Sequence, residues 1–167
     1  MLKAGGVGVM PTDTLYGLLA SAFNERAINR IYELKGRTVD KKSIILISSI
    51  GDLKAFNIAP TEEQQNILAR LWPGPVSIIL HRDLAFRIPD DKQLISFLKE
   101  SGPCIAPSAN PEGLAPAETV EEAKKYFGDN VDFYIDGGKR VGLASTLIKL
   151  DEHGNITVLR QGSTQVV

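Results

Sequence analysis

Short apolar runs bounded by turn residues recur along the chain and are separated by segments with helical periodicity. The runs lie at residues 7–10, 43–47, 76–80, 103–107, 131–135, 145–150 and 156–159. Such short runs, several of them rich in Val and Ile, are typical of buried strands. Because strands and helices mix without strict βαβ alternation, the sequence predicts an α/β fold, with helices packed on a mixed, twisted sheet.

Four helices are predicted from apolar residues at i, i+3 and i+4 and from residues that can cap a first turn. They are expected over 25–35 after Asn24, from Thr61 to about Leu71, over 92–100 after Asp90-Asp91, and from Thr119 to about Phe127. Thr119 and Glu122 have the spacing of a capping box. Pro73 must end the second helix, because proline cannot continue one.

The size and composition of the chain limit the classes of protein to which it can belong. Its 167 residues suit a single domain, 1–167, with a real core, and its net charge of −1 argues against a protein that mainly coats nucleic acid. No apolar run approaches a membrane span, and we expect a cytoplasmic protein with no secretion leader. The single Cys104 cannot form an internal disulfide, and His81 and His153 are too isolated for a structural zinc site.

Lys35-Gly36-Arg37 lies where the first helix gives way to a polar loop. The cations can cap the last helical carbonyls, or they can form an exposed clamp for an anion, with Arg as a planar fork and Lys as a point charge. Residues 25–42 hold six cations and three anions, a charge of +3, whereas residues 112–136 hold seven anions and two cations, a charge of −5. The chain is nearly neutral as a whole but carries one cationic region, which would attract an anionic substrate.

Two further polar segments each permit two interpretations. Thr12-Asp13-Thr14 follows the first strand, and Ser108-Ala109-Asn110 follows a later one. Their side chains can bind a ligand, but each segment taken alone is better explained as a turn stabilised by its own side chains. In the segment 86–89, alternation directs Arg87 away from the side taken by Phe86 and Ile88.

Together these segments resemble the threonylcarbamoyl-adenylate synthase family, whose domain is called YrdC-like. The matching stretches, in family order, are Pro11–Leu18, Leu34–Arg37, Trp72–Pro75, Arg87–Pro89, Ala106–Asn110, Asp136–Gly138, Ser145-Thr146 and Arg160–Gly162. Each is weak alone, but eight in order over nearly the whole chain make a specific signal. The resemblance implies an open, twisted sheet around a concave cationic cavity, in the minimal single-domain form of the family.

The resemblance also implies a reaction and a set of roles. The family joins L-threonine, bicarbonate and ATP into threonylcarbamoyl-adenylate and pyrophosphate, and the product passes to a tRNA threonylcarbamoyl transferase complex. The implied residues are Lys35 and Arg37 for catalysis, Lys35, Arg37, Ser108, Asn110 and Arg160 for ATP, and Thr12, Arg87 and Ser145 for threonine. Mg²⁺ is expected to arrive with the nucleotide, because no carboxylate cluster suggests a protein-built metal site.

The chain departs from the family pattern at three positions. Thr38 and Ser43 stand where the family usually has proline, and Ala144 stands where many members have glutamate. A paralogue that adenylates another carbamoyl or carboxy substrate remains an alternative, including the carbamoyl-adenylate domain of hydrogenase maturation, although that domain occurs in much longer chains. The alternative from another class is an RNA-binding or ribosome-assembly module. Low net charge favours the enzyme and predicts only weak tRNA binding.

Overall fold

A computed structural model describes residues 1–37, 43–81 and 83–166. Within them the strands are β1 (Gly8–Pro11), β2 (Tyr16–Ser21), β3 (Ile45–Leu46), β4 (Val76–His81), β5 (Leu84–Arg87), β6 (Cys104–Ile105), β7 (Phe133–Tyr134), β8 (Thr146–Leu150) and β9 (Ile156–Arg160). They form one sheet in the order β7-β1-β2-β6-β3-β5-β4-β8-β9. Parallel pairs (β1–β7, β3–β5 and β4–β8) stand among antiparallel ones, which confirms the predicted mixed sheet.

The helices are α1 (Glu25–Lys35), α2 (Glu62–Leu71), α3 (Lys92–Ser101) and α4 (Val120–Phe127), with 3-10 turns at Leu2–Ala4, Ile50–Phe56 and Gly128–Asn130. The predicted caps are confirmed: side chains of Asn24, Thr61, Asp91 and Thr119 each accept a hydrogen bond from a first-turn amide. The predicted capping box at Thr119 forms only in part. Glu122 accepts a bond from the Glu118 amide, one residue before the cap, so the box is not reciprocal.

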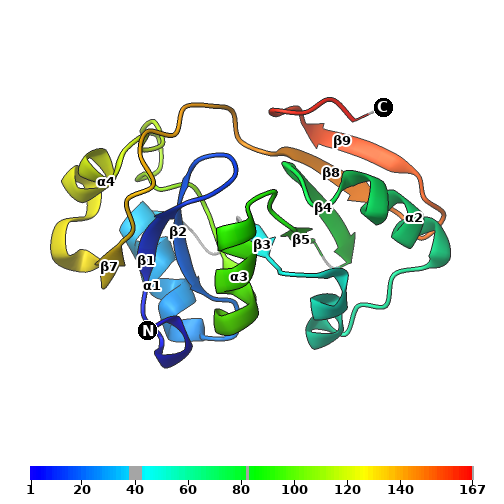
Figure 1. The fold of residues 1–167 in the computed structure, drawn as a ribbon, viewed down its shortest axis with the longest axis horizontal. Coiled ribbons are helices and arrows are strands. Elements are labelled where there is room, and N and C mark those ends of the chain that lie inside the picture. The colour runs from blue at the N-terminus through cyan, green and yellow to red at the C-terminus, as the bar shows by residue number, and fades with distance from the viewer. Residues whose placement is uncertain (38–42, 82, 167) are drawn as a thin grey trace.

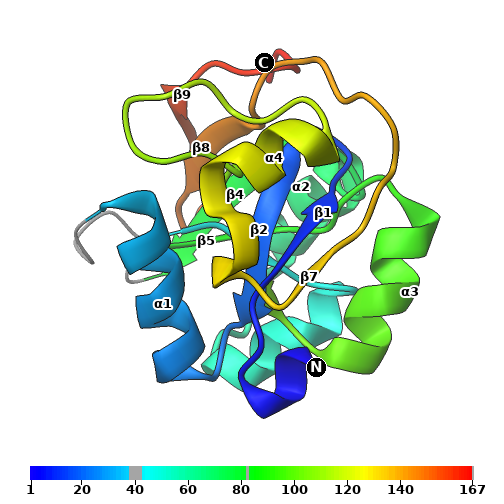
Figure 2. The same cartoon turned by 90° about the vertical axis from the view of Figure 1, so that its left-hand side faces the viewer.

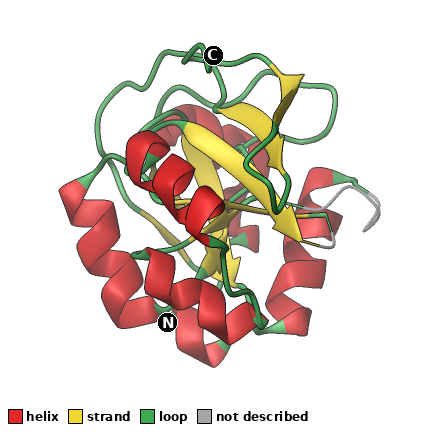
Figure 3. Ribbon diagram, turned by 90° about the vertical axis from the view of Figure 1, so that its right-hand side faces the viewer, coloured by secondary structure: helices red, strands yellow, loops and turns green. Residues whose placement is uncertain are grey.

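Different strands and helices lie at the two ends of the molecule. Figure 1 shows β1, β2, α1 and α4 at one end and β4, β8, β9 and α2 at the other, with the stretch after β7 running between them. In Figure 2, α1 and α3 lie on opposite sides of β1 and β2. Figure 3 shows helices along the sides and bottom of that view, and loops with the C-terminus along its top. No helix in the described part of the chain is both long and apolar enough to cross a membrane.

Three predicted strands are shorter in the structure than in the sequence. The runs 43–47, 103–107 and 131–135 contribute only the two-residue strands β3, β6 and β7. Prolines limit β6, because Pro103 and Pro107 have no N–H and take part only through carbonyls that accept from Ala22 and Leu18. Cys104 is fully buried in the core with Leu46 and Leu94, and burial raises the pKa of its thiol to about 11.

Candidate active site

A cavity of about 260 Å³ lies where the central strands meet their connecting loops. Its wall comes from the β1–β2 turn, the residue after the α1 cap, the entrance to β3, the β4–β5 hairpin, the segment after β6, and the neighbouring ends of β8 and β9. Six of the eight predicted site residues line it: Thr12, Arg37, Arg87, Ser108, Ser145 and Arg160. Folding therefore gathers residues that are separated by almost the whole sequence.

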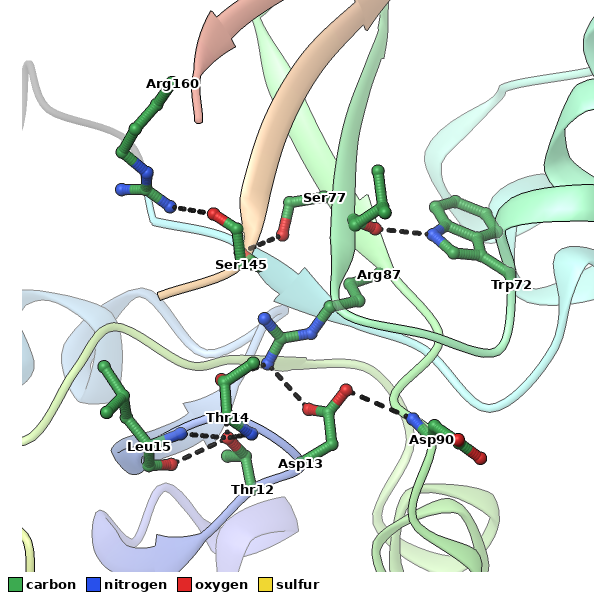
Figure 4. Close-up of polar contacts among 11 residues, drawn as sticks. Thr12, Asp13, Thr14, Leu15, Trp72, Ser77, Arg87, Asp90, Ser145 and Arg160 are labelled. Carbon is green, nitrogen blue, oxygen red and sulfur yellow. Dashed lines mark hydrogen bonds and ion pairs between the residues drawn. The ribbon is translucent and has the colours of Figure 1, made fainter. Parts of the chain in front are cut away.

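The Thr12 hydroxyl stabilises the turn that carries it. Its Oγ1 donates to the Leu15 carbonyl at 2.7 Å and accepts from the amides of Thr14 and Leu15, each at 3.2 Å. These are the local bonds that the turn interpretation requires. Thr12 lines the cavity, but its hydroxyl is engaged within the turn, as Figure 4 shows.

Arg87 reaches the cavity from the end of β5 and forms a buried ion pair. Its Nη2 lies 3.1 Å from Asp13 Oδ1, and the two side chains are only 5% and 4% exposed. Nη2 also donates to Thr14 Oγ1 at 3.4 Å, whereas Nε has no partner among the described residues. Burial lowers the pKa of the Arg87 guanidinium, Asp13 opposes that shift, and Arg160 adds to it. The guanidinium therefore stays oriented with part of its donor set unused.

Asp13 is itself fixed from its other side. Its Oδ2 accepts a hydrogen bond of 3.1 Å from the amide of Asp90, in the segment that leads into α3. In Figure 4, the Arg87 guanidinium lies between Ser145 on one side and the Asp13–Thr14 turn on the other. Asp13 was predicted only as part of a polar turn, and its long-range partner was missed.

Ser145 and Arg160 are joined at the β8 end of the cavity. The Ser145 hydroxyl is 2.8 Å from the hydroxyl of Ser77, and the Ser145 carbonyl accepts from Arg160 Nη2 at 2.9 Å. Burial lowers the pKa of Arg160. Ser77 gave no signal in sequence, because it is a polar residue within an apolar strand. Ser145 stays buried and paired although Ala144 replaces the family glutamate.

Lys35 lies behind the cavity wall and holds the Ser108–Asn110 segment. Its Nζ donates to the carbonyls of Ser108 and Asn110, each at 2.6 Å, and to Asn110 Oδ1 at 3.3 Å. Ser108 Oγ donates to that same Oδ1 at 2.6 Å. The structure thus brings together three residues of the implied ATP set, but two of them, Lys35 and Asn110, are not among the residues that line the cavity.

The expectation that Lys35 is exposed is wrong, because the residue is only 4% exposed. Burial lowers the pKa of its ammonium to about 8, the charge of Arg37 adds to this shift, and Glu112 opposes it. Gly36 adopts a left-handed conformation (φ 62°), which ends α1 and lets Arg37 leave on a different course. The two cations therefore separate, with Lys35 buried and Arg37 on the cavity wall.

Tyr16 ties the Asp136–Gly138 segment to the sheet next to the cavity. Its fully buried hydroxyl donates to the Gly138 carbonyl at 2.8 Å and accepts from the Gly137 amide at 3.0 Å. A side chain at Gly137 would collide with the ring of Pro11, so the close approach requires glycine there. These contacts give a structural reason for residues in two of the matching stretches, Pro11–Leu18 and Asp136–Gly138, that does not involve a ligand.

The charge of the cavity wall is mainly positive. The described lining residues include three arginines, Arg37, Arg87 and Arg160, and one acidic residue, Asp83. In the described part of the chain, no group of three His, Cys, Asp or Glu side chains could hold a metal ion. The wall therefore suits an anionic substrate and does not fit a protein-built Mg²⁺ site. Thr38, the first position at which the chain departs from the family, lies outside the described residues.

The model of the family of Sua5, YciO and YrdC, described as "Telomere recombination", matches residues 1–162. The chain belongs to this family. Among curated relatives it is 32% identical over 166 residues to the threonylcarbamoyl-AMP synthase of Pyrococcus abyssi, covering 90% of this chain and 49% of that protein. It is 30% identical over 149 residues to the enzyme of that name from Marinobacter nauticus, covering 80% of this chain and 78% of the relative.

A solved structure of a family member supports the same placement. The crystal structure titled P. abyssi Sua5 complexed with L-threonine superimposes with a TM-score of 0.87 at 31% identity, over 96% of this chain and 52% of that one. The predicted fold class and family are thus confirmed. The chain spans about half the length of the P. abyssi protein that it matches.

Proposed function

We propose that this chain joins L-threonine, bicarbonate and ATP into L-threonylcarbamoyl-adenylate and pyrophosphate, for the N6-threonylcarbamoyladenosine modification of tRNA. Relatives at about 30% identity carry the name threonylcarbamoyl-AMP synthase, and a structural neighbour was solved with L-threonine. The observation that carries the proposal is the buried guanidinium of Arg87 on the cavity wall, whose Nε, itself buried, has no partner among the described residues. A planar guanidinium of this kind is suited to a carboxylate.

The proposed reaction brings two anions together. The threonine nitrogen first forms a bond to the carbon of bicarbonate with loss of water, which gives a carbamate. One oxygen of this carbamate then attacks the α-phosphate of ATP. A phosphorus–oxygen bond forms there, and the bond to the leaving pyrophosphate breaks. Arg37 and Arg160 would neutralise the approaching and departing charges, which is the usual protein contribution to such transfers. Mg²⁺, where the nucleotide carries it, would add charge neutralisation on the phosphates.

The remaining implied residues would act by shaping the site. Lys35 would hold Ser108 and Asn110 from behind through its three contacts, and Ser108 would present the nucleotide contact. The hydroxyls of Thr12 and Ser145 already have internal partners, so their proposed contribution to threonine binding is to define the wall. The expected product would leave for the transferase complex.

A direct assay tests the proposal. The purified chain is incubated with ATP, Mg²⁺, L-threonine and ¹³C-bicarbonate, and the mixed anhydride is sought by mass spectrometry while pyrophosphate release is followed. We expect a labelled product that requires all three substrates. The matched pair Arg37→Gln and Arg26→Gln separates cavity charge from surface charge, because Arg26 is an exposed residue on α1. Product formed without threonine, or equal activity of the two variants, would contradict the assigned reaction or role.

A further inference from the structure

Asp13 has contacts that a turn residue does not need. Its side chain is 4% exposed, with one oxygen on the Asp90 amide and the other 3.1 Å from Arg87 Nη2. Asp90 and Arg87 follow Asp13 by more than seventy residues and precede α3 and end β5, respectively. The carboxylate therefore joins the β1–β2 turn to the stretch from Arg87 to Asp90, beside the cavity.

The contacts of Asp13 and Thr14 hold one nitrogen of the Arg87 guanidinium, Nη2. Asp13 and Thr14 both lie at Nη2, while Nε has no partner among the described residues. A guanidinium is a rigid, planar fork of five donors, so fixing one nitrogen fixes the direction of the others. Without Asp13, the long side chain would regain rotamer freedom, and its charge would lose the partner that offsets burial.

We propose that Asp13 is a positioning residue that holds Arg87 so that its remaining donors meet the carboxylate of the amino-acid substrate. The inference rests on the proposed function for the identity of that substrate. Asp13 does not line the cavity, so it acts through Arg87 and not by touching the ligand. Its loss should therefore weaken the binding of the amino acid and leave ATP binding nearly unchanged.

The test measures binding of L-threonine and of ATP separately, by calorimetry, to wild type and to Asp13→Asn. Asn keeps the size and can still accept from the Asp90 amide, but it removes the charge. We expect threonine affinity to fall about tenfold, as for loss of a charge-assisted contact, with ATP affinity within twofold of wild type. The matched control is Asp91→Asn, because Asp91 caps α3 and Asn caps equally well.

A double variant distinguishes positioning from a general structural effect. In the Arg87→Lys background, which has no fork to orient, Asp13→Asn should change threonine affinity by less than twofold. If Asp13→Asn does not fold, Thr14→Val removes the other contact on Nη2 and should give about a threefold loss that also disappears in that background. An equal loss in both backgrounds, or a parallel loss of ATP affinity, would overturn the positioning role.

The same experiment separates this inference from the proposed reaction. If the wild-type chain binds threonine but forms no adenylate, the reaction is wrong and the role of Asp13 is still measured by binding. If the wild-type chain binds ATP but no threonine, the carboxylate subsite at Arg87 is wrong, and the inference falls with it.

Discussion

Replacing Lys35 by methionine should make the stability difference from wild type depend on pH. Burial places the pKa of the Lys35 ammonium at about 8, against an ordinary value of 10.5. Below pH 8 the residue is protonated in both the folded and the unfolded chain, so the difference is constant. Between pH 8 and 10.5 the unfolded chain binds more protons than the folded chain, and stability therefore rises with pH.

The expected size follows from the shift. Each unit corresponds to about 1.4 kcal/mol, and after allowance for partial solvent screening we expect wild type to gain about 2–3 kcal/mol over Lys35→Met between pH 7.5 and 10.5. At pH 7.5 the variant should already be less stable, because the carbonyls of Ser108 and Asn110 lose their donor, at about 1–3 kcal/mol for each unsatisfied group.

Urea unfolding at a series of pH values measures this difference, with Lys54→Met as a control for removing an exposed lysine. The reasoning would be refuted by a wild-type advantage that stays constant across the range, since the ammonium would then not be desolvated. An advantage that shrinks as pH rises would show that the contacts to the carbonyls outweigh burial.

Two further comparisons test the packing around the cavity. Ser145→Ala should lower the free energy of unfolding by about 1–3 kcal/mol, because it leaves the buried Ser77 hydroxyl without its partner. Ser43→Ala should leave the free energy of unfolding unchanged or raise it slightly, because the buried Ser43 hydroxyl has no partner among the described residues. Equal losses in urea unfolding would contradict this contrast. Gly162→Ala should destabilise the chain by more than 1 kcal/mol, because a Cβ there would collide with the backbone of residues 144–146. Thermal unfolding compares this variant with Gly113→Ala. At Gly113 nothing lies within 4 Å of the added Cβ, so any loss of stability there comes from the positive φ and not from a collision.

Local patterns predicted the helices well, but they missed β2, because residues as far as Leu18 were interpreted as a polar turn and Tyr16–Ser21 is a fully buried strand. Asn24, Thr61, Asp91 and Thr119 start their helices as expected, because a cap depends on residues only two or three positions away. The order of strands in the sheet could not be read in this way. The placement of β6 between β2 and β3 depends on pairings across more than fifty residues, for which hydrophobic periodicity carries no information.

Six of the eight predicted site residues line one cavity, but their contacts could not be predicted from the sequence. Alternation along 86–89 correctly separated Arg87 from Phe86, which is fully buried in the core, whereas Arg87 lines the cavity. Its partner Asp13 was missed because a carboxylate between two threonines is explained equally well by local turn bonds. Sequence patterns report contacts between residues that are close along the chain. The contacts of Asp13 with Asp90 and Arg87 come from a distant part of the chain, so no local pattern could predict them.

One glycine, Gly36, separates Lys35 and Arg37 into two structural environments. Sequence spacing suggested that both cations clamp the same anion, but Lys35 ends α1 and is buried, and Gly36 then turns the chain through a left-handed conformation. The three acceptors around Lys35 Nζ can use all the hydrogens of its ammonium. We therefore expect the cavity arginines to offer positive charge to a ligand and Lys35 to hold the segment that carries Ser108.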